Sequence, residues 1–337
     1  MKKYSVWFTI NRACNLRCKW CYAQSTGFET KKEMSLELLD RLIDIVREFS
    51  LKNIILIGGE PTIHKDFFSI LDRVNQLGVN VGVVTNGIRF SDLNFLTECY
   101  EHGMDSTTIS LKAPTDDLYK QWTGVKALDK VSMAIENFHK LKKDFLVSLV
   151  LSEGVYRNIE DFIYFLKEMN ITRVFLDTER PVLLNNQPVY APLLDEIISG
   201  YNRVYDLFKK NEIKFIFKLS TPFCLLPKDI LKKMKANGNI QSSCSVIGDT
   251  GLPFDTNGDL LVCNTVCSNP IAKYGIDFKT GLELKQYKEK NNVKSFYDKM
   301  ASYPDKKCID CPEWVFCGGG CRIFWLYENP LLGKGVK

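Results

Sequence analysis

Three cysteines near the start of the chain are the residues best suited to carry chemistry. Cys14, Cys18 and Cys21 lie within eight positions, shortly after the apolar run 4–10. Cysteine thiolates bind zinc or iron–sulfur clusters, but a structural zinc needs a fourth ligand and no other cysteine or histidine is nearby. Three thiolates would instead leave one iron of a cubane [4Fe–4S] cluster open to an outside ligand. The spacing therefore favours a cluster with one open iron.

The composition of the chain limits the class of protein. Its 337 residues include 12 cysteines and three histidines, and its formal net charge is +5. The first ten residues have neither a signal-peptide core nor a cleavage site, and no apolar stretch approaches the roughly 18 residues of a membrane span. We therefore expect a cytoplasmic protein with no membrane segment and no dedicated nucleic-acid surface, whose thiols serve metal or redox chemistry instead of disulfides.

A second group of cysteines lies near the other end of the chain. Cys308, Cys311, Cys317 and Cys321 are separated by two, five and three residues, with three glycines, 318–320, before the last. Such a glycine run lets the backbone wrap a compact object. Four further thiols precede this group: Cys224, Cys244, Cys263 and Cys267. With so few histidines, all-thiolate binding of zinc or iron–sulfur is the favoured chemistry.

Alternating strand-like and helix-like segments must position these residues. The strand-like runs, rich in β-branched and aromatic residues, are 4–10, 53–57, 79–85, 106–111, 145–151 and 173–177. The first intervening helix is predicted to begin after Ser35 as its N-cap. Six such units predict an α/β fold, a partial (β/α)6 barrel of TIM type, in which chemistry lies at the C-terminal strand ends.

We assign the barrel to residues 1–212 and a small cysteine-rich iron–sulfur domain to residues 213–337. At their junction the pattern predicts a helix over 193–211 followed by a strand over 213–219. In the second part, Asn257-Gly258 predicts the turn of a hairpin.

The N-terminal cysteine motif resembles the signature of a known enzyme family. Cys14-x3-Cys18-x-Trp20-Cys21 matches the CxxxCxφC pattern of radical S-adenosylmethionine (SAM) enzymes, including the aromatic residue before the third cysteine. The resemblance implies that these cysteines hold the cluster and that SAM binds its open iron. It also implies that the following residues bind the cofactor: Trp20, Gly58, Gly59, Glu60, Thr85, Asn86, Ser110, Lys112 and Asn158.

Several of these assignments have simpler alternatives. In that family the Gly-Gly-Glu-Pro motif, here residues 58–61, meets the amino group of the methionine moiety, but two glycines also suit a tight turn. Lys112 stands where the family more usually has an aspartate, which puts its ribose contact in question. Asn158 is a weaker match to the family, and a solvated loop asparagine is the simpler interpretation.

Polar residues also follow the last predicted strand. Asp177 and Glu179 are the candidate catalytic residues, because a carboxylate at a barrel strand end can bind substrate or move a proton. Arg180 lies beside them. The alternative is a polar loop that caps the barrel.

The C-terminal cysteines resemble the SPASM extension of radical SAM enzymes, which holds auxiliary [4Fe–4S] clusters. The matching pattern is C-x13-G-x4-C followed by C-x2-C-x5-C-x3-C, but no cysteine follows the last one. The resemblance implies one cluster on Cys244, Cys263 and Cys321, for which we predict Cys224 as the fourth ligand. A second cluster would use Cys308, Cys311, Cys317 and Cys267, or keep an open iron if Cys267 does not reach it. Cys99, in a predicted helix, is left out as a buried structural thiol.

The resemblance implies a radical SAM oxidoreductase that generates a 5′-deoxyadenosyl radical and passes the substrate's electron to auxiliary clusters. Our leading hypothesis is oxidative maturation of a ribosomally made peptide, through cross-link formation. The alternatives are a small-molecule dehydrogenase, a peptide epimerase, protein oxidation of the sulfatase-maturase kind, and an electron-transfer module without radical catalysis. The expected partners are a peptide substrate, a separate leader-recognition protein, since the cysteine motif begins by residue 14, and a flavodoxin- or ferredoxin-type electron donor.

Overall fold

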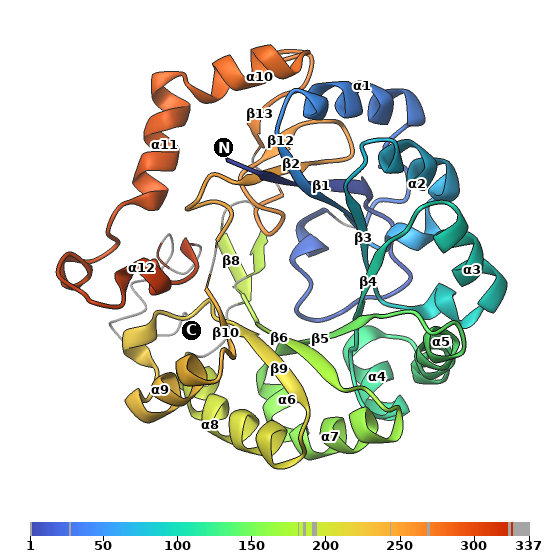
Figure 1. Ribbon diagram of the computed structural model, residues 1–337, viewed down its shortest axis with the longest axis vertical. Coiled ribbons are helices and arrows are strands. Elements are labelled where there is room, and N and C mark those ends of the chain that lie inside the picture. Colours follow the sequence, from blue (N-terminus) through green and yellow to red (C-terminus); the bar gives the residue numbers. More distant parts are fainter. Residues whose placement is uncertain are drawn as a thin grey trace.

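The six predicted β/α units are present and form a partial barrel of parallel strands (Figure 1). The computed structural model describes residues 2–26, 28–180, 182–184, 187–190, 194–242, 244–267, 270–322 and 325. Its first six strands are β1 Tyr4–Asn11, β2 Leu51–Gly58, β3 Asn80–Thr85, β4 Ser106–Ser110, β5 Leu146–Leu151 and β6 Arg173–Thr178. They pair in chain order, each parallel to the next. The predicted α/β barrel with a cysteine-rich C-terminal region is therefore confirmed.

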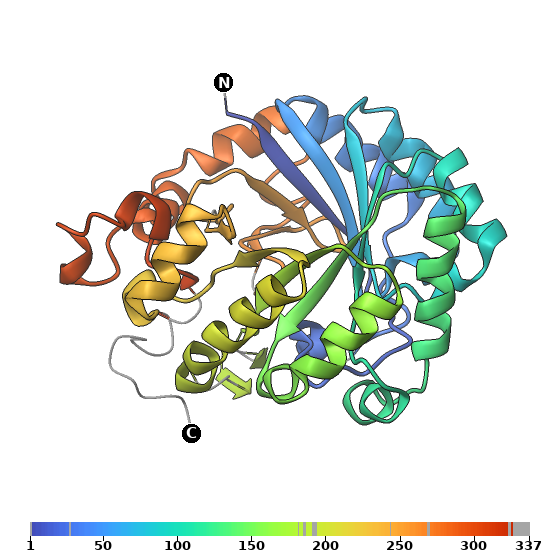
Figure 2. The same cartoon turned by 60° about the horizontal axis from the view of Figure 1, so that its bottom comes forward.

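Helices cover the outer face of these strands (Figures 1 and 2). Those of the barrel are α1 Leu36–Arg47, α2 Phe67–Asn75, α3 Leu93–Glu101, α4 Asp116–Thr123, α5 Leu128–Lys140, α6 Glu153–Arg157, α7 Ile159–Glu168 and α8 Leu194–Lys210. The remaining ones are α9 Lys228–Ala236, α10 Gly281–Lys288, α11 Asn291–Ala301 and α12 Trp314–Cys317. None of the helices in the described part of the chain is both long and apolar enough to cross a bilayer.

The barrel sheet does not stop at six strands. Strands β9 Lys214–Lys218 and β10 Ile240–Gln241 extend it beyond β6, while β11 Gly251–Phe254 pairs parallel with β1 at the other edge. Two antiparallel strands, β12 Leu260–Leu261 and β13 Pro270–Ala272, complete that edge. The C-terminal region thus adds strands to both edges of one 11-stranded sheet. A separate antiparallel pair is formed by β7 Val182–Leu184 and β8 Gln187–Tyr190. The boundary proposed at residues 212 and 213 stays a prediction.

Local sequence signals account for several of these elements. The Ser35 hydroxyl accepts a hydrogen bond from the Leu38 amide at 3.2 Å, as an N-cap should, and α1 buries one apolar face. Between β11 and β12 the chain turns at Gly258, whose φ of +85° suits glycine and confirms the predicted hairpin.

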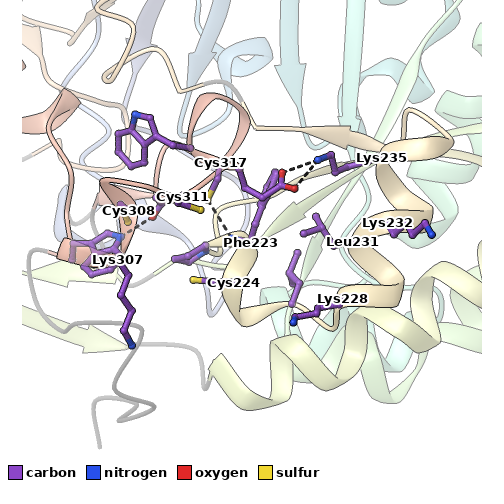
Figure 3. Close-up of a pocket in the computed structure, with 16 residues that line it drawn as sticks. Phe223, Cys224, Lys228, Leu231, Lys232, Lys235, Lys307, Cys308, Cys311 and Cys317 are labelled. Atoms are coloured by element: carbon purple, nitrogen blue, oxygen red, sulfur yellow. Dashed lines mark hydrogen bonds and ion pairs between the residues drawn. The ribbon is translucent and has the colours of Figure 1, made fainter.

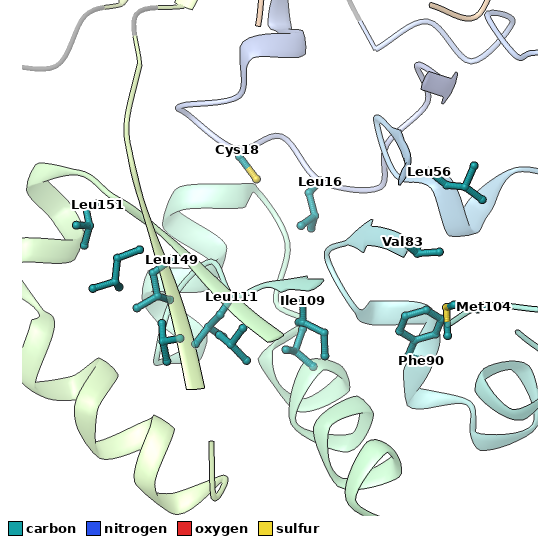
Figure 4. Close-up of a cluster of buried hydrophobic side chains, with 14 of the residues drawn as sticks. Leu16, Cys18, Leu56, Val83, Phe90, Met104, Ile109, Leu111, Leu149 and Leu151 are labelled. Carbon is teal, nitrogen blue, oxygen red and sulfur yellow. The ribbon is translucent and has the colours of Figure 1, made fainter. Parts of the chain in front are cut away.

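The buried core lies between the strands and the helices, and the N-terminal cysteine loop reaches into it. Leu16 and Cys18 are buried beside apolar side chains of the strands, including Val83, Ile109 and Leu149 (Figure 4). The loop between Cys14 and Cys21 is therefore anchored by hydrophobic packing within the motif itself.

Candidate functional site

The N-terminal cysteine loop is held against the loop that follows β2. The amide of Gly59 donates to the Asn11 carbonyl at 2.9 Å, and the amide of Glu60 donates to the Ala13 carbonyl at 2.8 Å. In return, the Asn11 side chain donates to the Glu60 carbonyl at 2.8 Å. These bonds place the first cysteine motif and the Gly-Gly-Glu-Pro motif side by side at the C-terminal end of the barrel strands, where barrel enzymes carry their active sites.

The two glycines of the second motif are required by this close approach. A Cβ atom on Gly59 would lie within 3.0 Å of the carbonyl oxygens of Arg12 and Ala13. One on Gly58 would lie equally close to the Asn11 side chain and carbonyl. Gly58 and Gly59 therefore allow two backbone segments to lie in close contact, a role beyond that of forming a tight turn.

The carboxylate of Glu60 connects three motifs. It is 1% exposed and accepts hydrogen bonds from the Thr85 hydroxyl at 2.6 Å and the Asn86 amide at 2.7 Å. It also accepts from the hydroxyl of Thr62 at 2.6 Å. The Asn86 side chain in turn donates to Asn15, inside the cysteine motif, at 2.7 Å. The structure thus brings Glu60, Thr85 and Asn86 together with the cysteine loop.

The three thiols lie in a desolvated environment. Burial raises the pKa of Cys14 to about 12 and that of Cys21 to about 11, and the neighbouring thiols add to both shifts. Lys112 lies within electrostatic reach of Cys18 and Cys21 and opposes the rise. Because a thiol must lose its proton to bind iron, metal binding would supply the free energy that keeps these groups charged.

Trp20 is positioned by protein contacts. Its ring meets that of Trp122, at the end of α4, edge to face with the centroids 5.8 Å apart. Backbone amides of Arg17 and Lys19 donate to the carbonyls of Thr123 and Trp122 at 2.8 and 3.2 Å. The end of α4 therefore supports the cysteine loop as well.

Two other predicted cofactor residues lie in local hydrogen-bond networks. Ser110, at the end of β4, accepts a bond from Ser148 at 3.3 Å. Asn158 lies between α6 and α7, and its side chain donates to the Gly154 carbonyl at 2.8 Å. This contact agrees with the alternative reading of Asn158 as a loop residue, and its role toward the cofactor stays a prediction.

The predicted catalytic carboxylates differ in their surroundings. Asp177 forms two hydrogen bonds with the Arg180 guanidinium, at 2.8 and 2.9 Å. Such a two-bond pair fixes the orientation of the carboxylate. Glu179 is buried, and its amide donates to the Leu151 carbonyl at 3.2 Å. Catalytic roles for Asp177 and Glu179 stay predictions.

A second group of thiols surrounds a cavity of about 500 Å³ in the C-terminal region. Its cysteines are Cys224, Cys308, Cys311 and Cys317 (Figure 3). Cys308 and Cys311 precede α12 and Cys317 ends it, whereas Cys224 belongs to the loop after β9. The backbone amide of Phe223 donates to the Cys317 sulfur at 3.3 Å. Two segments far apart in the sequence therefore meet at this cavity.

The thiols lie in groups that differ from the predicted ligand sets. Cys224 lines a cavity with Cys308, Cys311 and Cys317. Cys244, Cys263 and Cys321, with which it was predicted to share a cluster, do not line that cavity. Cys267 lies elsewhere, within electrostatic reach of Cys21, and lines a smaller hollow with Arg12. The predicted ligand sets stay predictions, and the sheet carries the β9 loop to the C-terminal cysteines, a placement that cysteine spacing does not reveal.

The other thiols lie near two arginines. Cys263 and Cys321 are within electrostatic reach of Arg180, and Cys244 and Cys321 are within reach of Arg322. In the described residues, no three His, Cys, Asp or Glu side chains surround a single metal-ion position. Cysteines gather in both the N-terminal and the cavity group, and thiolates are the ligands of iron–sulfur clusters.

Comparison with known proteins decides the family. The family model described as the radical SAM superfamily matches residues 8–177, half of the chain. The chain belongs to the radical SAM superfamily. Membership of this superfamily implies that the enzyme uses S-adenosylmethionine and a [4Fe–4S] cluster. Cys14, Cys18 and Cys21, which lie beside Glu60, form a donor set that fits this cofactor and cluster.

Curated relatives share the barrel. A protein named probable GTP 3′,8-cyclase of Pyrococcus abyssi is 30% identical over 183 residues, 54% of this chain and 59% of that protein. A protein of the same name from Sulfolobus acidocaldarius is 28% identical over 198 residues, 57% of this chain and 61% of that protein. The chain thus spans about three fifths of the length of these relatives.

Solved structures share the fold over nearly the whole chain. Native anSMEcpe with bound AdoMet and Kp18Cys peptide has a TM-score of 0.72 and 18% identity, over 96% of this chain and 91% of that one. Streptococcus suis SuiB bound to precursor peptide SuiA has a TM-score of 0.70 and 18% identity, over 96% of this chain and 72% of that one. At this identity the likeness concerns the fold alone.

Sequence reasoning missed two positioning residues. Asn15 and Thr62 form hydrogen bonds with residues of the predicted cofactor motifs. Only Asn15 carried a signal, because it lies inside the cysteine motif.

Proposed function

We propose that this enzyme oxidatively modifies a peptide, most simply by forming a cross-link, and that its C-terminal thiols hold two auxiliary [4Fe–4S] clusters. The observation that carries the proposal is the cavity lined by four cysteines in addition to the SAM-type thiols. A redox-neutral reaction has no need of further electron acceptors, whereas an oxidation does. The shared fold with two peptide-bound proteins supports a peptide as the substrate class.

The bound cofactors would supply hydrogen abstraction from the substrate by a 5′-deoxyadenosyl radical. The protein's own residues hold and orient them. Cys14, Cys18 and Cys21 bind the first cluster, and the backbone around Gly59 and Glu60 keeps that loop in place. Glu179, buried near Tyr156, is proposed to take the proton that leaves the oxidised substrate.

Auxiliary ligands and partners complete the proposal. We propose Cys244, Cys263, Cys321 and Cys267 as the ligands of the first auxiliary cluster. We propose a flavodoxin- or ferredoxin-type protein as the electron donor and a separate protein for leader recognition. Lysines around the cavity would favour an acidic electron donor; they include Lys228, Lys232 and Lys307.

A two-step experiment tests this function. The reconstituted, dithionite-reduced enzyme should cleave SAM under strictly anaerobic conditions, and Cys18→Ala should abolish cleavage whereas Cys99→Ala, at a buried helical thiol, should not. A short peptide encoded beside the gene is then co-expressed with the enzyme, and its mass is measured. Loss of hydrogen at defined residues supports oxidative maturation, while deuterium gained in deuterated water without oxidation indicates epimerisation. Absence of SAM cleavage contradicts the proposal.

A small-molecule reaction is the second candidate, because the curated relatives are named GTP 3′,8-cyclases. Incubation of the active enzyme with GTP tests that specific reaction. If the peptide is unchanged while a nucleotide product forms, the small-molecule function replaces the peptide function.

A further inference from the structure

Four thiols of the C-terminal region share one cavity although they come from two distant segments. Cys224 follows β9, and Cys308, Cys311 and Cys317 lie more than 80 residues later, yet all line the same space of about 500 Å³. That volume lies within the roughly 300–1,000 Å³ range of small-ligand sites. Figure 3 shows the Cys224 and Cys311 sulfurs on the cavity side of their segments.

The backbone is built to hold the two segments together. The Cys321 amide donates to the Ser220 carbonyl at 2.6 Å. A Cβ atom on Gly320 would lie within 3.0 Å of Ser220 and Pro222, so only glycine permits this approach. Gly320 also has a φ of +74°, which disfavours other residues. The glycine run 318–320 was predicted to let the backbone wrap a compact object. In the structure, its last glycine lies against the loop that carries Cys224.

The electrostatic surroundings suit an anionic cluster. Cys224, Cys308, Cys311 and Cys317 line one cavity, so four thiolates there would gather negative charge in one space. Four lysines line the same cavity: Lys228, Lys232, Lys235 and Lys307. Lys235 is paired with Glu313 at 2.7 Å, and the lysine charges offset the negative charge of four thiolates.

We propose that Cys224 is the fourth thiolate ligand of a [4Fe–4S] cluster held by Cys308, Cys311 and Cys317. This inference rests on the proposed function, in which the C-terminal thiols bind auxiliary clusters. In this assignment the fourth thiolate comes from the loop after β9, a segment far earlier in the chain. A cluster with four protein ligands has no open iron, so it exchanges electrons and does not bind the substrate.

Thiol labelling of the iron-loaded enzyme tests the assignment. The Cys224 side chain is exposed, so a free thiol there would react with iodoacetamide. We expect Cys224 to stay unlabelled in the anaerobic holoenzyme and to be fully labelled once a chelator has removed the iron, as mapped by peptide mass spectrometry. Cys99, buried in α3, should stay unlabelled in both samples until the chain is denatured.

A variant gives an independent readout. In the wild type, mild oxidation without SAM should release about one iron per chain, from the cluster with an open iron. In Cys224→Ala it should release about two, because an iron of the second cluster has also lost its thiolate ligand. Cys99→Ala should match the wild type. Labelling of Cys224 in the iron-loaded enzyme, or equal iron release from the two chains, overturns the assignment.

A further variant distinguishes failure of this ligand assignment from failure of the proposed function. In a chain with Cys14, Cys18 and Cys21 replaced by alanine, absence of bound iron would refute the auxiliary clusters altogether, and this ligand assignment with them. Iron retained in that chain with Cys224 labelled refutes the ligand assignment alone.

Discussion

At the scale of single residues, Glu60 is the side chain that joins the motifs predicted to bind the cofactor. Its buried carboxylate accepts bonds from Thr62, Thr85 and Asn86. The substitution Glu60→Gln removes the negative charge and turns an amide NH2 group toward groups that are themselves hydrogen-bond donors. Hydrogen bonds to charged groups contribute about 1.5–3 kcal/mol each to the free energy of unfolding. We expect the free energy of unfolding, measured in urea, to fall by about 2 kcal/mol, and SAM binding to weaken.

A matched control is Glu37→Gln, an exposed carboxylate paired with Arg41 on α1. Exposed pairs contribute about 0–1 kcal/mol, so this variant should stay close to the wild type. Equal effects of the two substitutions would contradict the role given to Glu60.

His64 makes stability depend on pH. It is 2% exposed, and burial lowers its pKa below the ordinary 6.5. The unfolded chain therefore binds more protons than the folded chain as the pH drops below about 6.5, and this histidine makes folding less stable there. Urea unfolding of the wild type and His64→Gln at several pH values should show a weaker decline toward acid for the variant. If the loss of stability toward acid pH is the same in the wild type and the variant, other titratable groups cause that loss.

At the scale of elements, the loop after β2 must approach the loop after β1 closely. Gly59→Ala would force a methyl group against the carbonyl oxygens of Arg12 and Ala13. Because both are backbone atoms, the cysteine loop must move, and we expect loss of the iron of the first cluster, about four atoms per chain. Iron analysis after anaerobic reconstitution measures the effect.

Gly248→Ala is the control for this prediction. A Cβ atom there would meet its nearest neighbours at 3.5 Å, an ordinary contact. Iron content should therefore be unchanged in Gly248→Ala, and full iron content in Gly59→Ala would show that the loop tolerates the methyl group.

At the scale of the whole molecule, a buried ion pair ties the start of the chain to its C-terminal region. Arg12 is 1% exposed and donates to Asp255, in the β11–β12 turn, at 2.7 and 3.0 Å. Asp255→Asn leaves the buried guanidinium without its counter-charge, which costs on the order of 3 kcal/mol. We expect that loss in urea unfolding, still as one transition, since β1 and β11 belong to one sheet.

The exposed pair between Arg203 and Glu160 supplies the comparison. Glu160→Gln should change the free energy of unfolding by less than about 1 kcal/mol. Separate transitions by far-UV circular dichroism and tryptophan fluorescence would show that the two regions unfold independently.

The sequence by itself determined the features that depend on near neighbours. The cysteine motif from Cys14 to Cys21, the helix cap at Ser35, the six strands of the barrel and the hairpin at Gly258 are all encoded within short stretches. Strand periodicity, capping and turn chemistry act over a few residues, so they can be recognised without the fold.

Only the tertiary structure decided which distant residues meet. The sequence did not indicate that Cys224 joins Cys317, that Arg12 pairs with Asp255, or that β11 extends the barrel beside β1. These contacts join residues 93 or more positions apart. They follow from how the sheet closes and from which loops it brings together, and neither spacing nor residue type specifies that arrangement.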